Sequence, residues 1–153
     1  MSLRPFFHEN KVEVGLDEVG RGCLAGPVVT AAVILPKDFD FPIVKDSKKL
    51  SEKKRKEAFE LIKEKAIDYS ISFIPPQTID KINILQATME GMHTCLNTLE
   101  SNFNHILVDG NYFVPYKEIP HDCVIKGDTI RPRVILKNVG RVPILTFNIN
   151  CIS

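Results

Sequence analysis

Apolar and polar positions alternate along the first half of the chain in a way that predicts three strands. Val12, Val14 and Leu16 alternate with other residues, which predicts a strand over residues 12–17. Residues 28–35 form a near-continuous apolar run, typical of a strand that is covered on both faces. Residues 67–74 alternate again and predict a third strand, closed by Pro75 and Pro76.

Two stretches have the apolar spacing of amphipathic helices. In residues 52–66 the apolar positions share one face and Lys and Glu cover the other; these positions are Ala58, Phe59, Ile62 and Ala66. Asn83 is a suitable N-cap for a second helix over residues 84–99. Its expected buried side comprises Leu85, Thr88, Met92, Cys95, Leu96 and Leu99. Between these regions, Thr78 or Asp80 could cap a short turn.

Short strands are predicted over residues 105–108 and 123–125, separated by a loop that contains Pro115 and Pro120. Strands followed by helices, after an opening pair of strands in hairpin-like succession, predict an α/β fold with a mixed sheet. A chain of 153 residues is long enough for one domain with a substantial core.

Composition narrows the classes of partner. The net charge is only +1, and all 19 acids precede residue 129, so a polyanion would have to be held by a local patch or through metal ions. No apolar run is long enough to span a bilayer and the N-terminus lacks an apolar signal core, so we expect a cytoplasmic protein. The widely spaced Cys23, Cys95, Cys123 and Cys151 are expected to be packing residues or incidental thiols.

Asp17 and Glu18 stand beside a Gly20-Arg21-Gly22 turn, directly after the first predicted strand. The glycines allow another chain to approach closely, and the arginine offers a forked cation suited to phosphate. The stretch therefore indicates metal and phosphate chemistry. The alternative is a surface turn after an edge strand.

Two later strands are also followed by acids, Asp109 and Asp128. Singly, Asp109-Gly110 and Gly127-Asp128 are ordinary turn dipeptides. Ligands of open α/β sheets gather outside strand ends, where four such carboxylates could converge. Hard divalent cations would neutralise them, and a pair of these ions about 3.5–4 Å apart would support phosphodiester hydrolysis.

Five blocks in this order resemble the ribonuclease HII family, the type 2 ribonucleases H: GLDEVGRGCLAGP from residue 15, DSKKLS from 46, NILQAT from 83, VDGN from 108 and KGD from 126. The resemblance implies a ribonuclease H-like fold, with a mixed central sheet flanked by helices. It also implies an endonuclease that needs Mg²⁺ or Mn²⁺. The expected substrates are RNA–DNA hybrids and DNA duplexes containing single ribonucleotides, with 5′-phosphate products. No membrane association and no obligate protein partner is expected.

The resemblance also implies roles for particular residues. The family's four metal-binding acids match Asp17, Glu18, Asp109 and Asp128. Its motif for sensing the ribonucleotide 2′-hydroxyl matches Gly20, Arg21 and Gly22. Its segment near the substrate backbone matches Ser47, Lys48 and Lys49, which are candidates for phosphate contact. Residues 53–56 are also basic, and we interpret them as the solvated face of a helix. His93 and His105 are assigned to structure.

After Asp128 the sequence departs from the family pattern of helices and a stacking tyrosine. Residues 131–153 contain no acid, two prolines and no helical period. We therefore divide the chain into a catalytic domain at 1–130, incomplete at its C-terminal helical part, and a divergent basic tail at 131–153.

This change of composition suggests a frameshift or a diverged gene end. If no other reading frame after codon 128 restores the family's helix, the frameshift hypothesis is wrong. An incomplete domain would expose apolar surface, predicting low stability or association with another chain. Two further functions stay open: a catalytically inactive homologue with weak or no hybrid binding, and another metal-dependent phosphoryl transfer on the same fold.

Overall fold

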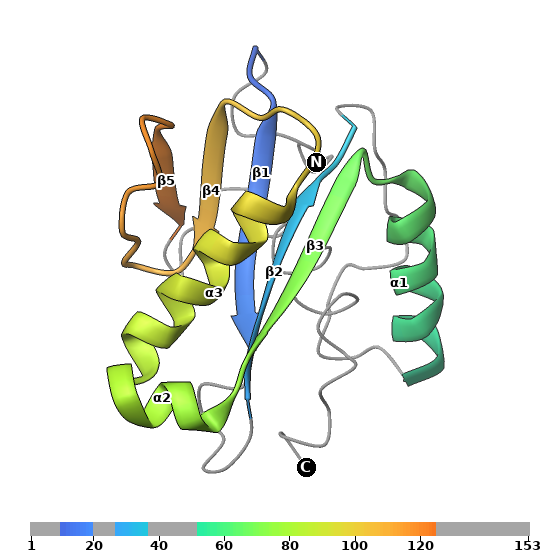
Figure 1. Cartoon of the computed structure of the whole chain (residues 1–153). Helices are drawn as coiled ribbons and strands as arrows, with labels where there is room; N and C mark the ends of the chain where they lie inside the picture. The colour runs from blue at the N-terminus through green and yellow to red at the C-terminus, as the bar shows by residue number, and fades with distance from the viewer. Residues whose placement is uncertain (1–9, 20–26, 37–51, 125–153) are drawn as a thin grey trace.

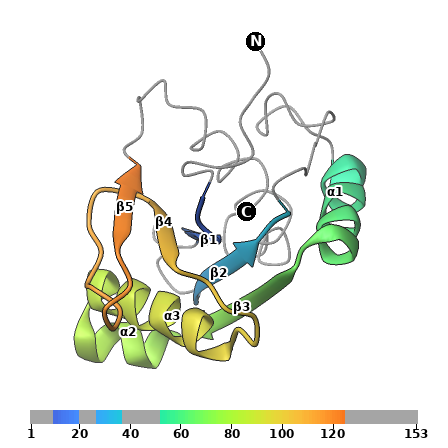
Figure 2. The same cartoon turned by 90° about the horizontal axis from the view of Figure 1, so that it is seen from above.

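The computed structural model describes residues 10–19, 27–36 and 52–124. They form a five-stranded mixed sheet in the order β3-β2-β1-β4-β5, with helices on both faces (Figures 1 and 2). The strands are β1 (Glu13–Val19), β2 (Val28–Ile34), β3 (Asp68–Ile74), β4 (His105–Asp109) and β5 (His121–Val124). The helices are α1 (Glu52–Lys65), α2 (Pro76–Ile82) and α3 (Ile84–Thr98). The α/β class with a mixed sheet is confirmed.

Strand β2 is buried along its whole length, as its apolar run predicts. It runs antiparallel to both neighbours, β1 and β3, whereas β4 is parallel to β1 and β5 is parallel to β4. Odd and even positions of β2 contribute to different cores. Val29, Ala31 and Val33 pack with Ile62 of α1, while Ala32 and Ile34 belong to the cluster beneath α3.

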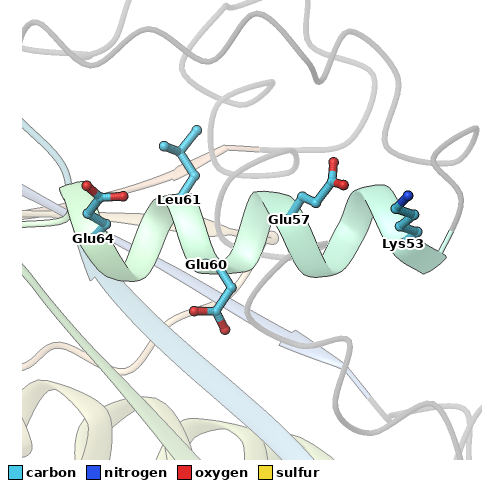
Figure 3. A pocket seen from close by; sticks show the side chains of 5 residues that line it. All are labelled: Lys53, Glu57, Glu60, Leu61 and Glu64. Atoms are coloured by element: carbon cyan, nitrogen blue, oxygen red, sulfur yellow. The ribbon is translucent and has the colours of Figure 1, made fainter.

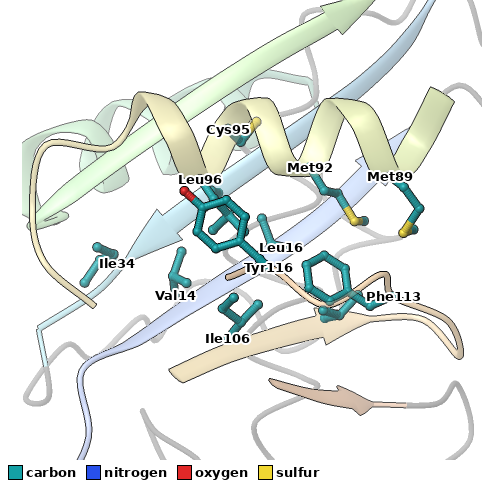
Figure 4. Close-up of a cluster of buried hydrophobic side chains, with 12 residues drawn as sticks. Val14, Leu16, Ile34, Met89, Met92, Cys95, Leu96, Ile106, Phe113 and Tyr116 are labelled. Carbon is teal, nitrogen blue, oxygen red and sulfur yellow. The ribbon is translucent and has the colours of Figure 1, made fainter. Parts of the chain in front are cut away.

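The larger core lies between α3 and the sheet (Figure 4). Val14, Leu16, Ile106 and Val108 of the two central parallel strands meet Met89, Met92, Cys95 and Leu96 of α3 there. Asn83 caps α3 as predicted, because its side-chain oxygen accepts a hydrogen bond from the Gln86 amide at 3.0 Å. Met89 and Ala87 also belong to the buried side of α3, and Leu85 is only half-buried.

Several boundaries differ from the sequence-based expectations. β1 continues two residues beyond 17, because its pairing with β2 extends to Val19 opposite Val29. α2 replaces the expected short turn, and it begins at Pro76 rather than at a cap by Thr78 or Asp80, since proline suits the first helical position. β5 begins two residues early, where His121 pairs with Ile106. Ile125 lies outside the described residues.

The alternation of β3 predicts that only one of its faces is packed, but the structure has buried or half-buried residues on both faces. Ser70 is 6% exposed because its hydroxyl donates to the Cys95 carbonyl at 2.7 Å beneath α3. Phe73, on the apolar side of the pattern, is 56% exposed. Tyr69 and Ile71, on the same side of β3, are half-buried against the cluster that contains Ile62, so of these three Phe73 alone departs from the pattern.

Candidate active site

Asp17 lies in β1, the middle strand of the described sheet, and is only 2% exposed. Its partner across the β1–β2 ladder is Ala31, which packs in the cluster that contains Ile62 of α1. Residues directly opposite on paired strands share a face, so Asp17 lies on the face that carries α1. Its Oδ1 accepts a hydrogen bond from the Glu18 amide at 2.7 Å. The strand that precedes the glycine-arginine segment is therefore not an edge strand of the described sheet, whereas the turn expected at residues 20–22 lies outside the described residues.

Asp109 ends β4, the parallel neighbour of β1. Leu16 and Val108 are paired across these strands and both belong to the core beneath α3. The next residues along, Asp17 and Asp109, therefore stand beside each other on the opposite face, on strands about 4.8 Å apart. One carboxylate oxygen of each is shielded from solvent.

The two aspartates occupy the point where the strand order reverses. From β1 the chain continues to β2 on one side, and the later strand β4 lies on the other. In open α/β sheets, ligands bind in the crevice outside the carboxyl ends of strands at such a switch point. The sheet topology therefore selects the end of β1 and β4 as the candidate site.

Glu18 lies at the same end of the sheet but on the other face. Its partner is Thr30, whose hydroxyl is 3.3 Å from the Cys95 sulfur of α3. The strand pleat thus separates the adjacent acids Asp17 and Glu18, as the alternation of side chains in a strand requires. The structure brings together Asp17 and Asp109, with Glu18 half-buried nearby on the α3 side.

The remaining predicted site residues lie outside the described residues: Gly20, Arg21, Gly22, Ser47, Lys48, Lys49 and Asp128. The glycine-arginine segment directly follows β1, and Asp128 comes four positions after Val124, which pairs with Asp109. Within residues 10–19, 27–36 and 52–124, no three His, Cys, Asp or Glu side chains form a metal-binding group. The described part of the candidate centre is the pair Asp17 and Asp109.

This pair fits a hard divalent cation. Two carboxylates side by side repel each other, and burial strengthens that repulsion because solvent screens it less. A cation bound between them would offset the repulsion, and oxygen-only ligands suit Mg²⁺ or Mn²⁺. The shielded oxygens of both side chains fit such a role.

A family model for ribonuclease HII matches residues 14–134 of the chain. The chain belongs to the ribonuclease HII family. It is 49% identical over 126 residues to ribonuclease HII of Bacteroides fragilis and 48% identical over 126 residues to that of Parabacteroides distasonis. Each alignment covers 82% of this chain and 63% of the relative, so the chain spans less than two thirds of the length of these relatives.

Solved structures agree with the ribonuclease HII assignment at the level of the fold. Ribonuclease H2 from Pyrococcus horikoshii has a TM-score of 0.66 at 23% identity, and the match covers 85% of this chain and 70% of that one. An Archaeoglobus fulgidus RNase HII, solved in a complex with PCNA, has a TM-score of 0.64 at 22% identity over 92% of this chain and 74% of that one. The expected ribonuclease H-like fold is confirmed.

One hollow on this ribonuclease HII chain lies along α1. Its lining includes Lys53, Glu57, Glu60, Leu61 and Glu64, all on one helix (Figure 3). Lys53 and its acidic neighbours are exposed, as expected for a solvated helix face. Among the residues that the structure describes, its lining includes neither Asp17 nor Asp109.

The two histidines assigned to structure both have specific partners. His93 Nε2 is 2.8 Å from the Val114 carbonyl, and its ring meets Phe113 and Tyr116. His105 Nε2 is 2.8 Å from Asp122 Oδ2 on β5. No local pattern in the sequence indicates Asp122, because its place beside His105 depends on the register of β5 on β4. No helix of the described chain is long and apolar enough to cross a membrane.

Proposed function

We propose that this chain is a Mg²⁺- or Mn²⁺-dependent endonuclease that hydrolyses the RNA strand of RNA–DNA hybrids, including at single ribonucleotides in duplex DNA. One observation carries the proposal: two carboxylates, those of buried Asp17 and half-buried Asp109, lie side by side at the switch point of a ribonuclease HII family chain. Acids at a sheet's carboxyl edge suit metal-assisted phosphoryl chemistry better than a structural role.

The metal-holding residues would be Asp17, Glu18, Asp109 and Asp128. Because β5 ends beside Asp109, the chain sets out toward Asp128 from the same end of the sheet. Glu18 would reach the centre around the end of β1. When bound, a pair of divalent cations supplies an activated water and stabilises the leaving oxygen of an in-line displacement.

The protein's own residues would orient the substrate. The Glu18 amide holds Asp17 in one rotamer, which fixes the direction of its carboxylate. Backbone groups of Gly20, Arg21 and Gly22 would recognise the 2′-hydroxyl, the group that distinguishes RNA from DNA. Ser47, Lys48 and Lys49 would contact backbone phosphates, and such contacts position the duplex without reading its sequence. The products would carry 3′-hydroxyl and 5′-phosphate ends.

Catalysis would lie in residues 1–130 of a cytoplasmic protein, and residues 131–153 would form a divergent basic tail. A second candidate function is an inactive homologue that binds hybrid weakly or not at all. The observation that favours it is the composition of residues 131–153, which departs from the family pattern by having no acid and no helical period.

One assay tests both candidates. The purified chain is incubated with a DNA duplex containing one ribonucleotide, with and without Mn²⁺, beside an all-DNA duplex and an Asp109→Asn variant. We expect metal-dependent cleavage at the ribonucleotide that the substitution abolishes. Binding of the duplex without cleavage would favour the inactive homologue. Cleavage that survives in Asp109→Asn would contradict the proposed site.

A further inference from the structure

The chain crosses from the candidate site to α3 in the segment directly after Asp109, residues 110–116. Asp109 lies on the face that carries α1, whereas Phe113 belongs to the core beneath α3 (Figure 4). The residues between them therefore pass over the carboxyl edge of the sheet. Gly110 has a φ of 156°, which glycine adopts more readily than other residues, so the backbone beside Asp109 has few steric restraints of its own. Contacts further along the segment must fix the direction in which the chain leaves Asp109.

His93 of α3 contacts this segment at three places. Its Nε2 lies 2.8 Å from the Val114 carbonyl oxygen. A carbonyl can only accept a hydrogen bond, so Nε2 carries a proton and donates it. The imidazole centroid is also 5.3 Å from the ring centroids of both Phe113 and Tyr116, which are buried. Ring pairs at this separation add a preferred geometry to the burial of apolar surface.

Two further residues of α3 contact the same segment. The Val114 amide donates to Met89 Sδ at 3.4 Å, and the Tyr116 hydroxyl donates to Asn97 Oδ1 at 2.6 Å. Met89, His93 and Asn97 follow one another at intervals of four residues, so they lie on one face of the helix. His93 is the middle one, and its polar contact is nearer to Asp109 along the chain than that of Asn97.

We propose that His93 is a positioning residue for the metal centre: by holding residues 110–116 on α3, it fixes the end of β4 and therefore the place of the Asp109 carboxylate beside Asp17. His93 does not itself bind the metal, since α3 and the aspartate pair lie on opposite faces of the sheet. This inference rests on the proposed function, because the place of Asp109 matters for binding only if the pair holds a cation.

The test measures Mn²⁺ binding to the whole chain by electron paramagnetic resonance and hydrogen exchange of the amides in residues 109–114. Both are recorded at a temperature where thermal unfolding shows each variant to be folded. We expect His93→Ala to weaken Mn²⁺ binding about three- to tenfold and to speed exchange in this segment. His93→Gln, which keeps a side-chain N–H donor, should restore most of the binding.

His93→Phe keeps an aromatic ring and loses the donor, so it tests the same hydrogen bond even if His93→Ala does not fold. We expect it to weaken Mn²⁺ binding, although its melting temperature should stay closer to that of the parent. If His93→Phe binds Mn²⁺ as the parent does, or if His93→Gln binds no better than His93→Phe, the hydrogen bond to Val114 does not position Asp109 and the proposal is overturned.

The matched control is Asn97→Ala, which removes a hydrogen bond to the same segment from the same face of α3. It should speed exchange near Tyr116 and leave Mn²⁺ binding unchanged. If Asn97→Ala weakens Mn²⁺ binding as much as the His93 variants do, His93 adds only general stability and its positioning role is overturned, while the proposed function stands. If the parent binds no Mn²⁺, the proposed function fails and the positioning role fails with it.

Discussion

Asp17 has an unusual environment for an acid, since it is 2% exposed in the middle strand of the sheet with Asp109 beside it on the next strand. Carboxylates are rarely buried unless they are paired or bind metal. The two carboxylates thus lie together where solvent screens their mutual repulsion poorly.

Repulsion between these two carboxylates predicts that Asp109→Asn stabilises the metal-free protein. Removing one of two neighbouring like charges should raise the free energy of unfolding by about 1 kcal/mol, or the melting temperature by about 2–4 °C for a chain of this size. Thermal unfolding in EDTA measures the change. Asp80→Asn, at an exposed position of α2, is the control and should have no effect. A lower melting temperature for Asp109→Asn would count against repulsion in the pair.

Cys95 is a second buried group that titrates, on the other side of the sheet. Burial raises the pKa of its thiol, although hydrogen bonds from Thr30 and Ser70 act in the opposite direction. The folded state therefore keeps the proton to a higher pH than the unfolded chain, whose cysteines titrate near about 8.5. Stability from this group is present below that pH and is lost as the pH rises toward the folded pKa.

We accordingly expect the free energy of unfolding to fall above about pH 8.5, with Cys95 contributing a slope of up to about 1.4 kcal/mol per pH unit. Urea unfolding between pH 7 and 10 measures that slope. Cys95→Ala should lower stability at every pH yet show a shallower pH dependence than the parent. Parallel curves for the two proteins would rule out a buried thiol that stays protonated.

At the scale of elements, the sequence predicts best where one local signal dominates. β2 is recognisable from its apolar run and α3 from its period and its Asn83 cap. The predicted end of the first strand and the predicted start of the last strand were wrong, and the helix α2 was missed. Strand ends depend on partners distant in sequence, such as Val19 with Val29, and these partners leave no local pattern.

Asn83 illustrates a local signal that can be tested. Its φ of 71° and ψ of 168° form a conformation that glycine adopts far more readily than other residues, and its side chain caps α3. Asn83→Ala loses the cap and keeps a Cβ in this conformation, so we expect a loss of about 1 kcal/mol in unfolding free energy. Asn83→Gly, which relieves the φ, should lose clearly less. Equal losses, measured by urea unfolding, would contradict the assigned backbone conformation.

Gly91 reports on how closely α3 approaches the sheet. A Cβ at this position would lie 2.8 Å from Thr30 Oγ1 and 2.9 Å from Thr30 Cγ2. Overpacking costs about 1–3 kcal/mol, whereas alanine gains about 1 kcal/mol in helix propensity. Gly91→Ala should therefore destabilise the protein by about 1 kcal/mol net in thermal or urea unfolding, while Glu90→Ala on the exposed side should be near neutral. A stabilised Gly91→Ala would show that α3 packs less tightly.

For the whole molecule, the candidate site follows from the strand order, which no local pattern encodes. The sequence suggests that Asp17 and Asp109 follow strands, but only the parallel pairing of β1 with β4 makes them neighbours. The strand pleat places Glu18 on the α3 side, a separation that the prediction of four converging acids did not include. Asp128 and the Gly20-Arg21-Gly22 segment lie outside the described residues, so their roles stay predictions.

The central claim is that Asp17 and Asp109 jointly bind a divalent cation, and titration of the whole chain with Mn²⁺ tests it most directly. We expect Asp17→Asn and Asp109→Asn each to weaken binding at least about tenfold, and the double variant to be little worse than either, because ligands of one ion act as a unit. Asp80→Asn should bind as the parent does. Absence of binding in the parent, or additive effects of the two substitutions, would contradict a shared metal centre.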